Sequence, residues 1–286
     1  MKTKISAPIT DHRSPITLPR LMGILNVTPD SFYDGGRYLS PEAAERLREL
    51  ADDGADLIDI GAESSRPGSA RISADEELGR LRPIFQVLRN YQLPPISIDT
   101  TKSKVAKEAF ASGAAILNDI SGLRHDPDGM LGALNGFSQS RLVLMHMKGD
   151  PQTMQMNPDY QDVFGEIAEF FEERLRFLEK NGISGERVIL DPGIGFGKKL
   201  EHNLEILRRI PDFKKRFGRP VLIGASRKSM IGMILDGAPP EERLEGSLTV
   251  AVWCAEQGVD YLRVHDVKET WRALKVRATI TNSYKL

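Results

Sequence analysis

Eight short runs of apolar and β-branched residues recur along this chain of 286 residues, and longer amphipathic runs separate them. Short apolar runs are typical of buried strands, and the longer runs are typical of helices. Eight strand–helix repeats in about 250 residues predict a single-domain (β/α)8 barrel of the α/β class. A doubly wound open sheet is the alternative, because alternation alone does not establish closure. The predicted strands are 21–27, 56–61, 95–99, 115–119, 141–145, 187–191, 220–224 and 260–264.

The helical runs carry start and stop signals. Apolar residues recur at helical spacing over 160–181, and another helical run covers 243–257. Ser40, followed by Pro41 and Glu42, predicts a helix start. Glycine stands between a helical run and the next strand at several places, which predicts helix ends there. These glycines are Gly54, Gly113, Gly182 and Gly258.

Composition and charge exclude several classes of protein. Lys and Arg total 39 and Asp and Glu total 40, so the net charge of −1 indicates neither a nucleic-acid partner nor a membrane partner. The single cysteine, Cys254, excludes an internal disulfide, and its helical run predicts a small core residue. No apolar run reaches the ~18 residues of a membrane helix and no signal peptide is evident, so we expect a cytoplasmic protein. We expect an N-terminal extension over 1–20 and one catalytic domain over 21–286.

Polar side chains lie at or just after the end of every predicted strand. In such a barrel the carboxyl ends of the strands meet at one face, where active sites form. Any one of these residues alone is typical of a cap or a turn. Their recurrence predicts a ring of polar side chains around one mouth, and therefore a binding site. The residues are Asn26, Asp59 with Glu63, Asp99, Asn118 with Asp119, His146, Asp191, Arg227 with Lys228, and Arg263 with His265.

This ring combines two kinds of chemistry. Asp99, Asp191 and Asn118 can pair with a flat heterocycle that has adjacent N–H donors, since a carboxylate accepts two parallel N–H bonds. Mg²⁺ takes few protein ligands beside a diphosphate and completes its coordination with phosphate oxygens and water. The residues that suit an anion such as a diphosphate are Lys228, Arg263, His265 and Asn26.

Other classes of active site find less support. The five histidines include no H-x₃-H pair, which argues against zinc, and no G-x-S-x-G elbow supports a nucleophilic serine. Gly193, Gly195 and Gly197 follow Asp191 and Pro192. We interpret this segment as a side-chain donor followed by a tight turn rather than as a phosphate-binding loop.

The segments that carry these residues resemble the dihydropteroate synthase family. The resemblance runs from Leu21 to Val276, and its motifs occur in the family's order. The family folds as a (β/α)8 barrel, in agreement with the strand count above. The motifs are Leu-Asn-Val-Thr-Pro-Asp-Ser-Phe at 25–32, Asp-Ile-Gly-Ala-Glu-Ser-Ser-Arg-Pro-Gly at 59–68, Ser-Ile-Asp-Thr at 97–100, Asn-Asp-Ile at 118–120, Leu-Met-His-Met at 144–147, Asp-Pro-Gly-Ile-Gly-Phe-Gly-Lys at 191–198, Ser-Arg-Lys-Ser at 226–229 and Arg-Val-His-Asp at 263–266.

What the resemblance implies is a condensation in folate biosynthesis. A 6-hydroxymethyl-7,8-dihydropterin diphosphate loses diphosphate, and the amine of 4-aminobenzoate takes its place. Asp99 and Lys228 are implied as catalytic residues, together with Asp34 on a loop that closes over the substrates. An Asp99 carboxylate would stabilise the positive charge that develops in the pterin as diphosphate leaves.

The resemblance also implies the binding residues and a homodimer through late helices that include 243–257. The implied pterin contacts are Asp99, Asn118, Asp191, Lys228 and Met145. The implied 4-aminobenzoate contacts are Ser65, Arg66, Pro67, Phe196, Lys228 and Ser229. The implied diphosphate contacts are Asn26, Arg263 and His265, with the cofactor Mg²⁺ at Asn26.

Three positions near the implied 4-aminobenzoate pocket depart from the family pattern. Ala62 replaces a glycine, Ser65 replaces a threonine, and Met230 replaces a common aromatic residue. Each substitution changes shape or flexibility, so we expect reduced sensitivity to sulfonamides. Two other functions stay open, a corrinoid-linked pterin methyltransferase and a non-catalytic pterin-binding paralogue. The segment 226–229 and the diphosphate residues favour the synthase.

Overall fold

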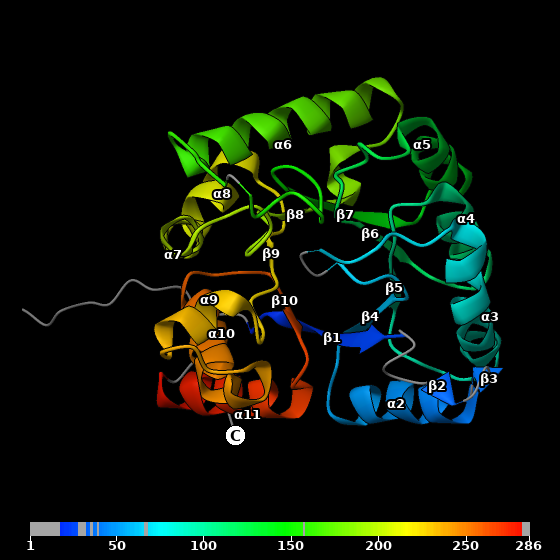
Figure 1. Ribbon diagram of the computed structural model, residues 1–286, viewed down its shortest axis with the longest axis horizontal. Coiled ribbons are helices and arrows are strands. Elements are labelled where there is room, and N and C mark those ends of the chain that lie inside the picture. Colours follow the sequence, from blue (N-terminus) through cyan, green and yellow to red (C-terminus); the bar gives the residue numbers. More distant parts are fainter. Residues whose placement is uncertain are drawn as a thin grey trace, which may run out of the picture.

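The computed structural model describes residues 18–27, 33–34, 37–38, 40–65, 68–156 and 158–281. For residues 33–34, 37–38, 40–43 and 89–90 it describes the backbone alone. Parallel strands form the centre of the molecule and helices surround them (Figure 1). No helix in the described part of the chain is both long and apolar enough to cross a membrane.

The parallel strands form a closed barrel. They pair in the order β8-β7-β6-β5-β4-β1-β10-β9, and a bridge between Leu190 and Val221 joins the two ends of this row. The amide of Leu190 also donates to the carbonyl of Pro220 at 2.9 Å. The predicted barrel is therefore confirmed and the open sheet was wrong. The strands are β1 (Arg20–Asn26), β4 (Leu57–Gly61), β5 (Ile96–Asp99), β6 (Ile116–Asp119), β7 (Arg141–Met145), β8 (Val188–Asp191), β9 (Leu222–Ile223) and β10 (Tyr261–Val264).

Helices follow the barrel strands, and a small antiparallel hairpin lies between β1 and the first of them (Figure 1). The hairpin pairs β2 (Tyr33–Asp34) with β3 (Arg37–Tyr38). Ser40 was expected to be the N-cap residue, with the helix beginning at Pro41. Helix α2 begins at Ser40 itself, one residue earlier. The helices are α2 (Ser40–Asp52), α3 (Ala74–Asn90), α4 (Ser103–Ala111), α5 (Pro127–Gly136), α6 (Val163–Lys180), α7 (Leu200–Arg208), α8 (Ile210–Phe217), α9 (Ser229–Ile234), α10 (Leu244–Glu256) and α11 (Val267–Ile280).

The predicted helix ends are confirmed. All four stop glycines have positive φ, for example +96° at Gly54 and +103° at Gly113. The amide that follows each of them bonds back to the helix, as Ala55 does to the Leu50 carbonyl at 3.0 Å. Cys254 is fully buried on α10, so its predicted core position is confirmed as well.

Two apolar layers separate the inside of the barrel from its outside. The larger layer lies between the strands and the helices. The smaller layer has the opposite strand parity, so its side chains point into the barrel and close its floor. The residues of this inner layer are Met22, Leu57, Ile116, Val143, Ile189, Leu222 and Tyr261.

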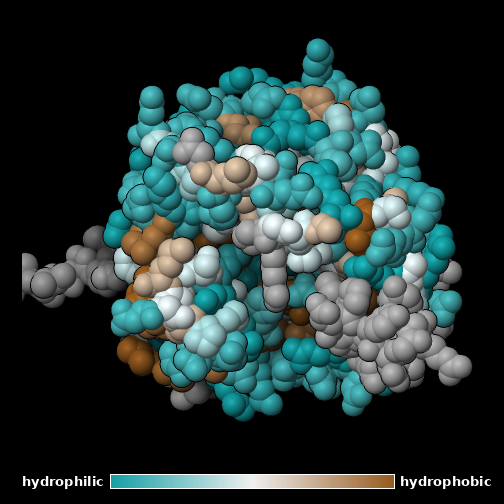
Figure 2. All heavy atoms as spheres, in the orientation of Figure 1, coloured by the Kyte–Doolittle hydropathy of each residue, from teal (hydrophilic) through white to brown (hydrophobic). Residues whose placement is uncertain are grey.

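One corner of the molecular surface is unusually apolar. Brown residues gather at the lower left of Figure 2, where Figure 1 places α9, α10 and α11. The exposed fractions are 62% for Met233, 50% for Ile234 and 43% for Trp253. On α11, Val276 and Ile280 are 61% and 77% exposed. Contiguous exposed apolar residues of this kind mark an interaction surface.

Candidate active site

The polar ring lies one step above the apolar floor of the barrel. Side chains two residues apart on a strand point to the same side, so the residue two positions beyond each floor residue also faces inward. On β4 this residue is Asp59, on β6 Asn118, on β8 Asp191 and on β10 Arg263. Since these strands are parallel, the polar residues lie together at the carboxyl-terminal mouth. Asp99 ends β5 beside them.

Arg263 connects two aspartates of the ring. Its Nε donates to Oδ2 of Asp59 at 2.6 Å, and its Nη2 donates to Oδ2 of Asp99 at 3.1 Å. Asn118 Nδ2 donates to the same Asp59 oxygen at 3.0 Å. This hydrogen bond fixes the orientation of the Asn118 amide, because its nitrogen donates to Asp59 and its oxygen is directed away from Asp59.

Two buried oxygens of this cluster have no hydrogen-bond partner in the described part of the chain. They are Oδ1 of Asp59 and Oδ1 of Asn118. Buried polar atoms are nearly always paired, so an unpaired acceptor in a mouth indicates a place for a donor from a ligand. Asp191 and Asn118 lie on β8 and β6, and the Met145 side chain of β7 is buried beside them.

Burial shifts the pKa values of the charged groups at the mouth. The pKa of Asp99 rises to about 8, chiefly through burial and next through the charge of Asp59, and Arg263 opposes this rise. The pKa of Asp191 also rises through burial, with Lys228 opposing. Burial lowers the pKa of Lys228 to about 8, against the attraction of Asp191. Perturbed groups clustered in one cleft are typical of an active site.

The loop after β8 brings Phe196 and Lys228 together. Asp191 accepts from the amide of Gly193 at 2.7 Å, so this loop begins as the predicted tight turn. Lys228 Nζ donates to the Ile194 carbonyl at 2.5 Å and lies 4.5 Å from the centre of the Phe196 ring. Lys228 is the N-cap of α9, the helix that follows β9, and its side chain contacts the loop after β8. Its position therefore depends on both strands.

The remaining predicted contacts, His265 and Asn26 for the anion and Ser229 for 4-aminobenzoate, lie at or after the ends of β10, β1 and β9. The Nδ1 atom of His265 is 3.1 Å from the hydroxyl of Ser226, and burial lowers the pKa of His265 to about 4. Asn26 ends β1 with an exposed side chain. Ser229 is exposed at the first turn of α9.

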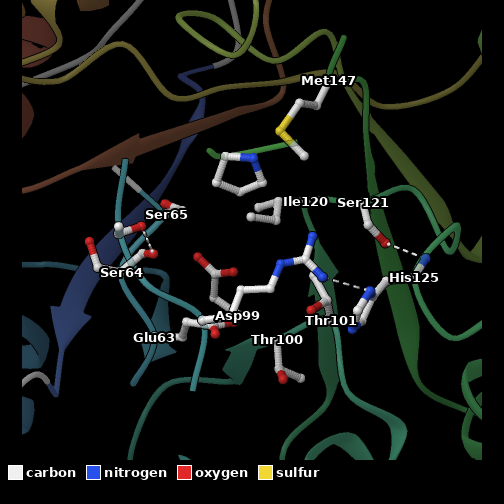
Figure 3. Close-up of a pocket in the computed structure, with 13 residues that line it drawn as sticks. Glu63, Ser64, Ser65, Asp99, Thr100, Thr101, Ile120, Ser121, His125 and Met147 are labelled. Carbon is white, nitrogen blue, oxygen red and sulfur yellow. Dashed lines mark hydrogen bonds between the residues drawn. The ribbon is translucent and has the colours of Figure 1, made fainter. Parts of the chain in front are cut away.

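An open hollow lies among the ends of β4, β5, β6 and β7. Asp99 stands at its centre, with Ser64 and Ser65 to one side and Met147 across from them (Figure 3). Ile120 lies beside Asp99, so the hollow combines a carboxylate, hydroxyls and apolar surface. Such a mixture suits an aromatic ring with polar ends.

Some predicted residues cannot be compared with this geometry. Arg66 and Pro67 lie outside the described residues, as does the side chain of Asp34, whose backbone belongs to β2. Three substitutions relative to the family pattern were expected near the 4-aminobenzoate pocket, and two of them lie elsewhere. Ala62 and Met230 are buried in the apolar core and do not line the hollow, whereas Ser65 does.

Two buried ion clusters were not predicted from the sequence. Lys198 is buried, and its Nζ lies 3.0 Å from Nδ1 of His146 and 3.0 Å from the Phe196 carbonyl. Lys102 bonds to Glu77 and to Glu63, which lines the hollow. The helical spacing of Glu77 with Leu81 and Ile84 was an available sign of burial, but it did not identify the partner.

The fold and the site define an enzyme with a (β/α)8 barrel whose mouth binds a flat heterocycle. The pterin binding enzyme family model matches residues 22–265. Dihydropteroate synthase of Escherichia coli K12 is 46% identical over 261 residues, which cover 90% of each chain. The synthase of Synechocystis is 45% identical and covers 90% of this chain and 88% of its own.

Solved structures agree with these relatives. The Yersinia pestis dihydropteroate synthase in complex with a sulfonamide drug has a TM-score of 0.86 and 41% identity, and covers 93% of this chain and 95% of its own. The Xanthomonas albilineans enzyme in complex with 7,8-dihydropteroate has a TM-score of 0.81 and 38% identity, with 93% and 95% covered. This chain belongs to the dihydropteroate synthases within the pterin binding enzyme family. It is a transferase, and the methyltransferase alternative is not favoured.

Proposed function

We propose that the barrel mouth condenses 6-hydroxymethyl-7,8-dihydropterin diphosphate with 4-aminobenzoate and releases 7,8-dihydropteroate and diphosphate. The observation that carries the assignment of roles is the buried set of acceptors at the mouth. Asp191 and the unpaired Oδ1 of Asn118 face the same space, and an aminopyrimidine presents adjacent N–H donors that match them. Lys228 lies next to Asp191 and would donate toward the carbonyl side of the pterin.

Asp99 and Lys228 carry the electrostatic part of the proposed reaction. The bond between the pterin's exocyclic carbon and the diphosphate oxygen breaks, and diphosphate leaves with the electron pair. The amine nitrogen of 4-aminobenzoate forms the new bond to this carbon and then loses a proton. Positive charge spreads into the pterin during departure, and the ionised form of Asp99, which Arg263 contacts at 3.1 Å, would stabilise that charge.

Diphosphate would leave through the face that contains Asn26, Arg263 and His265. Arg263 holds a full positive charge beside Asp99, so it can attract the leaving group. We propose Mg²⁺ as the cofactor and Asn26 as its protein ligand. The exposed amide oxygen of Asn26 fits an ion that takes few protein ligands and keeps water and phosphate oxygens. When bound, this ion neutralises charge on the departing diphosphate.

The hollow beside Asp99 would hold 4-aminobenzoate. Ser65 and Met147 line it. Phe196, Lys228 and Ser229 are not among its lining residues, although Phe196 packs against the methionine cluster that includes Met147. The Xanthomonas albilineans relative was solved with 4-aminobenzoic acid and is 41% identical, with a TM-score of 0.85. Arg66, Pro67, Ser229 and Asp34 remain proposed contacts from the resemblance.

The proposal is tested by a coupled assay for dihydropteroate formation with and without Mg²⁺. Lys228→Ala is expected to lower kcat at least ~10²-fold, because it removes a fixed charge at the reacting ring. Asn26→Ala is expected to raise the Mg²⁺ concentration needed for half-maximal rate. Lys215→Ala, on the outer helix α8, is the matched control for Lys228. Near-normal turnover of Lys228→Ala, or an unchanged Mg²⁺ response of Asn26→Ala, would remove that residue from its proposed role.

We also propose a homodimer through the apolar corner made by α9, α10 and α11. The exposed side chains of Met233, Ile234 and Val276 support it, since a second copy would remove them from water. The predicted helix over 243–257 is α10, which contributes the 43% exposed Trp253 to this corner, whereas its small residues Ala251, Cys254 and Ala255 are buried in the core.

A further inference from the structure

A buried ion cluster adjoins the proposed 4-aminobenzoate hollow, and one of its members, Glu63, lines that hollow. Lys102 Nζ donates to Oε2 of Glu77 at 2.6 Å and to Oε2 of Glu63 at 2.9 Å. The side chain of Glu77 is fully buried, and those of Lys102 and Glu63 are 13% and 19% exposed. We call these three residues the Lys102 cluster.

The Lys102 cluster joins three elements around the hollow. Glu63 begins the loop after β4, Glu77 belongs to α3, and Lys102 lies between β5 and α4, three residues after Asp99. The backbone amide of Lys102 also donates to the hydroxyl of Thr100 at 3.2 Å. One ammonium group therefore links the loop that faces 4-aminobenzoate to the strand end that carries Asp99.

Glu63 extends this link to both described ends of the loop. Its second oxygen, Oε1, accepts from the amide of Ile72 at 2.8 Å, so one side chain holds both the start and the end of the loop. Arg80 of α3 holds the loop start as well, by donating to the Ala62 carbonyl at 2.8 Å. Between these points lie Ser64 and Ser65, which line the hollow (Figure 3).

The cluster is a poor source of stability. It places two carboxylates against one ammonium group, and burial raises the pKa of Glu77. Oε1 of Glu77 has no hydrogen-bond partner in the described part of the chain. Apolar residues can replace buried ion clusters of this kind without loss of stability. The cluster therefore matters for the position of the loop rather than for the stability of the fold.

We propose that Lys102 is a positioning residue for 4-aminobenzoate and for sulfonamides. Through Glu63 it holds the loop after β4 in the shape that places Ser64 and Ser65 against the aromatic substrate. The inference rests on the proposed function, because it concerns the second substrate of that reaction. It assigns no contact between Lys102 and either substrate.

The test removes the cation and one buried charge together, in the double variant Lys102→Met with Glu77→Gln. We expect the KM for 4-aminobenzoate and the inhibition constant of a sulfonamide to rise together, about tenfold or more, as for the loss of one charged hydrogen bond. The kcat with both substrates saturating and the KM for the pterin diphosphate are expected to stay within about twofold. Lys102→Arg keeps a cation and should restore most of the affinity.

A matched control breaks an exposed ion pair between the same two helices. Lys104 of α4 pairs with Asp75 of α3, with side chains 59% and 77% exposed. Lys104→Met with Asp75→Asn is expected to leave all kinetic constants unchanged. If the Lys102 double variant does not fold, Glu63→Gln leaves the Lys102–Glu77 pair intact and serves the same comparison.

The outcomes separate the two proposals. A wild-type protein that forms no dihydropteroate overturns the proposed function. An active wild type with an unchanged KM for 4-aminobenzoate in the double variant overturns the positioning role alone. Equal rises in both KM values, or a lower melting temperature without a change in KM, would also overturn it, because they indicate general distortion.

Discussion

Asp99 meets two opposing demands at the mouth of the barrel. In the proposed reaction its carboxylate must be ionised to stabilise positive charge in the pterin, yet burial and the neighbouring Asp59 raise its pKa to about 8. Arg263 offsets part of this cost through its 3.1 Å contact. A residue in this position is expected to favour activity at the expense of stability.

Asp99→Asn is therefore expected to change activity and stability in opposite directions. The amide cannot ionise, so kcat should fall at least ~10²-fold. Between pH 3.8 and about 8 the folded protein retains a proton that the unfolded chain has lost, so the Asp99 contribution lowers the free energy of unfolding as pH rises. The Asn variant lacks this decline.

The stability part is measured by urea unfolding at pH 6 and pH 8.5. We expect the Asn variant to gain stability relative to wild type between these two values of pH. Asp128→Asn, on the outer helix α5, is the control for general effects of the substitution. A difference between Asp99→Asn and wild type that does not grow with pH would contradict the burial of an ionised Asp99.

At the level of elements, loops that follow neighbouring strands pack closely against one another. Gly193 in the loop after β8 has φ of +71°, and a Cβ atom there would overlap the carbonyl oxygen of His146 after β7. The amide of the same glycine holds Asp191. The position of Asp191, the proposed pterin contact on β8, thus depends on the close approach of a second loop.

Gly193→Ala is expected to lose more stability than a glycine substitution that carries backbone strain alone. Gly182→Ala supplies that comparison, because Gly182 has φ of +81° and open space around it. Positive φ alone costs about 1–2 kcal/mol in an alanine. Thermal unfolding measures the difference, and titration with 6-hydroxymethylpterin should show weaker binding to the Gly193 variant only. Equal losses in the two variants would argue against the overlap.

The loop after β4 carries the prediction about sulfonamides. Ser65 lines the hollow, so Ser65→Thr is expected to lower the ratio of sulfonamide inhibition constant to 4-aminobenzoate KM. A shape change of one methyl group is typically worth ~1–3 kcal/mol of discrimination. Met230→Phe is expected to leave this ratio unchanged and to destabilise the protein, because Met230 is 1% exposed in the core. A ratio that responds to Met230 rather than to Ser65 would reverse the assignment.

The sequence predicted the strands well because apolar runs and terminal polar residues are local signals. The predicted strand 95–99 is β5 at Ile96–Asp99, for instance. The Lys102 cluster could not be predicted in this way, because its three members come from separate elements and pair only after folding. The predicted position of Met230 differs from the structure for a related reason. Met230 follows Lys228 closely in the sequence, but its side chain on α9 is buried in the core and does not line the hollow.

For the whole molecule, barrel closure is what makes a single site out of scattered residues. Asp59 on β4 and Arg263 on β10 are 204 positions apart in the chain, yet they bond at 2.6 Å. They can meet because only one strand, β1, separates β4 from β10 in the barrel and both side chains point inward. Closure through Leu190 and Val221 likewise brings β8 beside β9, and so Asp191 beside Lys228. The same closure leaves the outer helices free to make other contacts.

The apolar corner on α9, α10 and α11 is expected to hold two copies together. Ile234→Glu places a charge beside the exposed Met233 and Leu235, where a partner copy would have to bury it. We expect this variant to elute as a monomer in size-exclusion chromatography with light scattering, at concentrations where the wild type is a dimer. Tyr91→Glu is the control, since Tyr91 is 46% exposed and follows α3, which Figure 1 places on the other side of the barrel from α9. A wild type that is monomeric at all concentrations, or an Ile234 variant that stays dimeric, would show that this corner is not the interface.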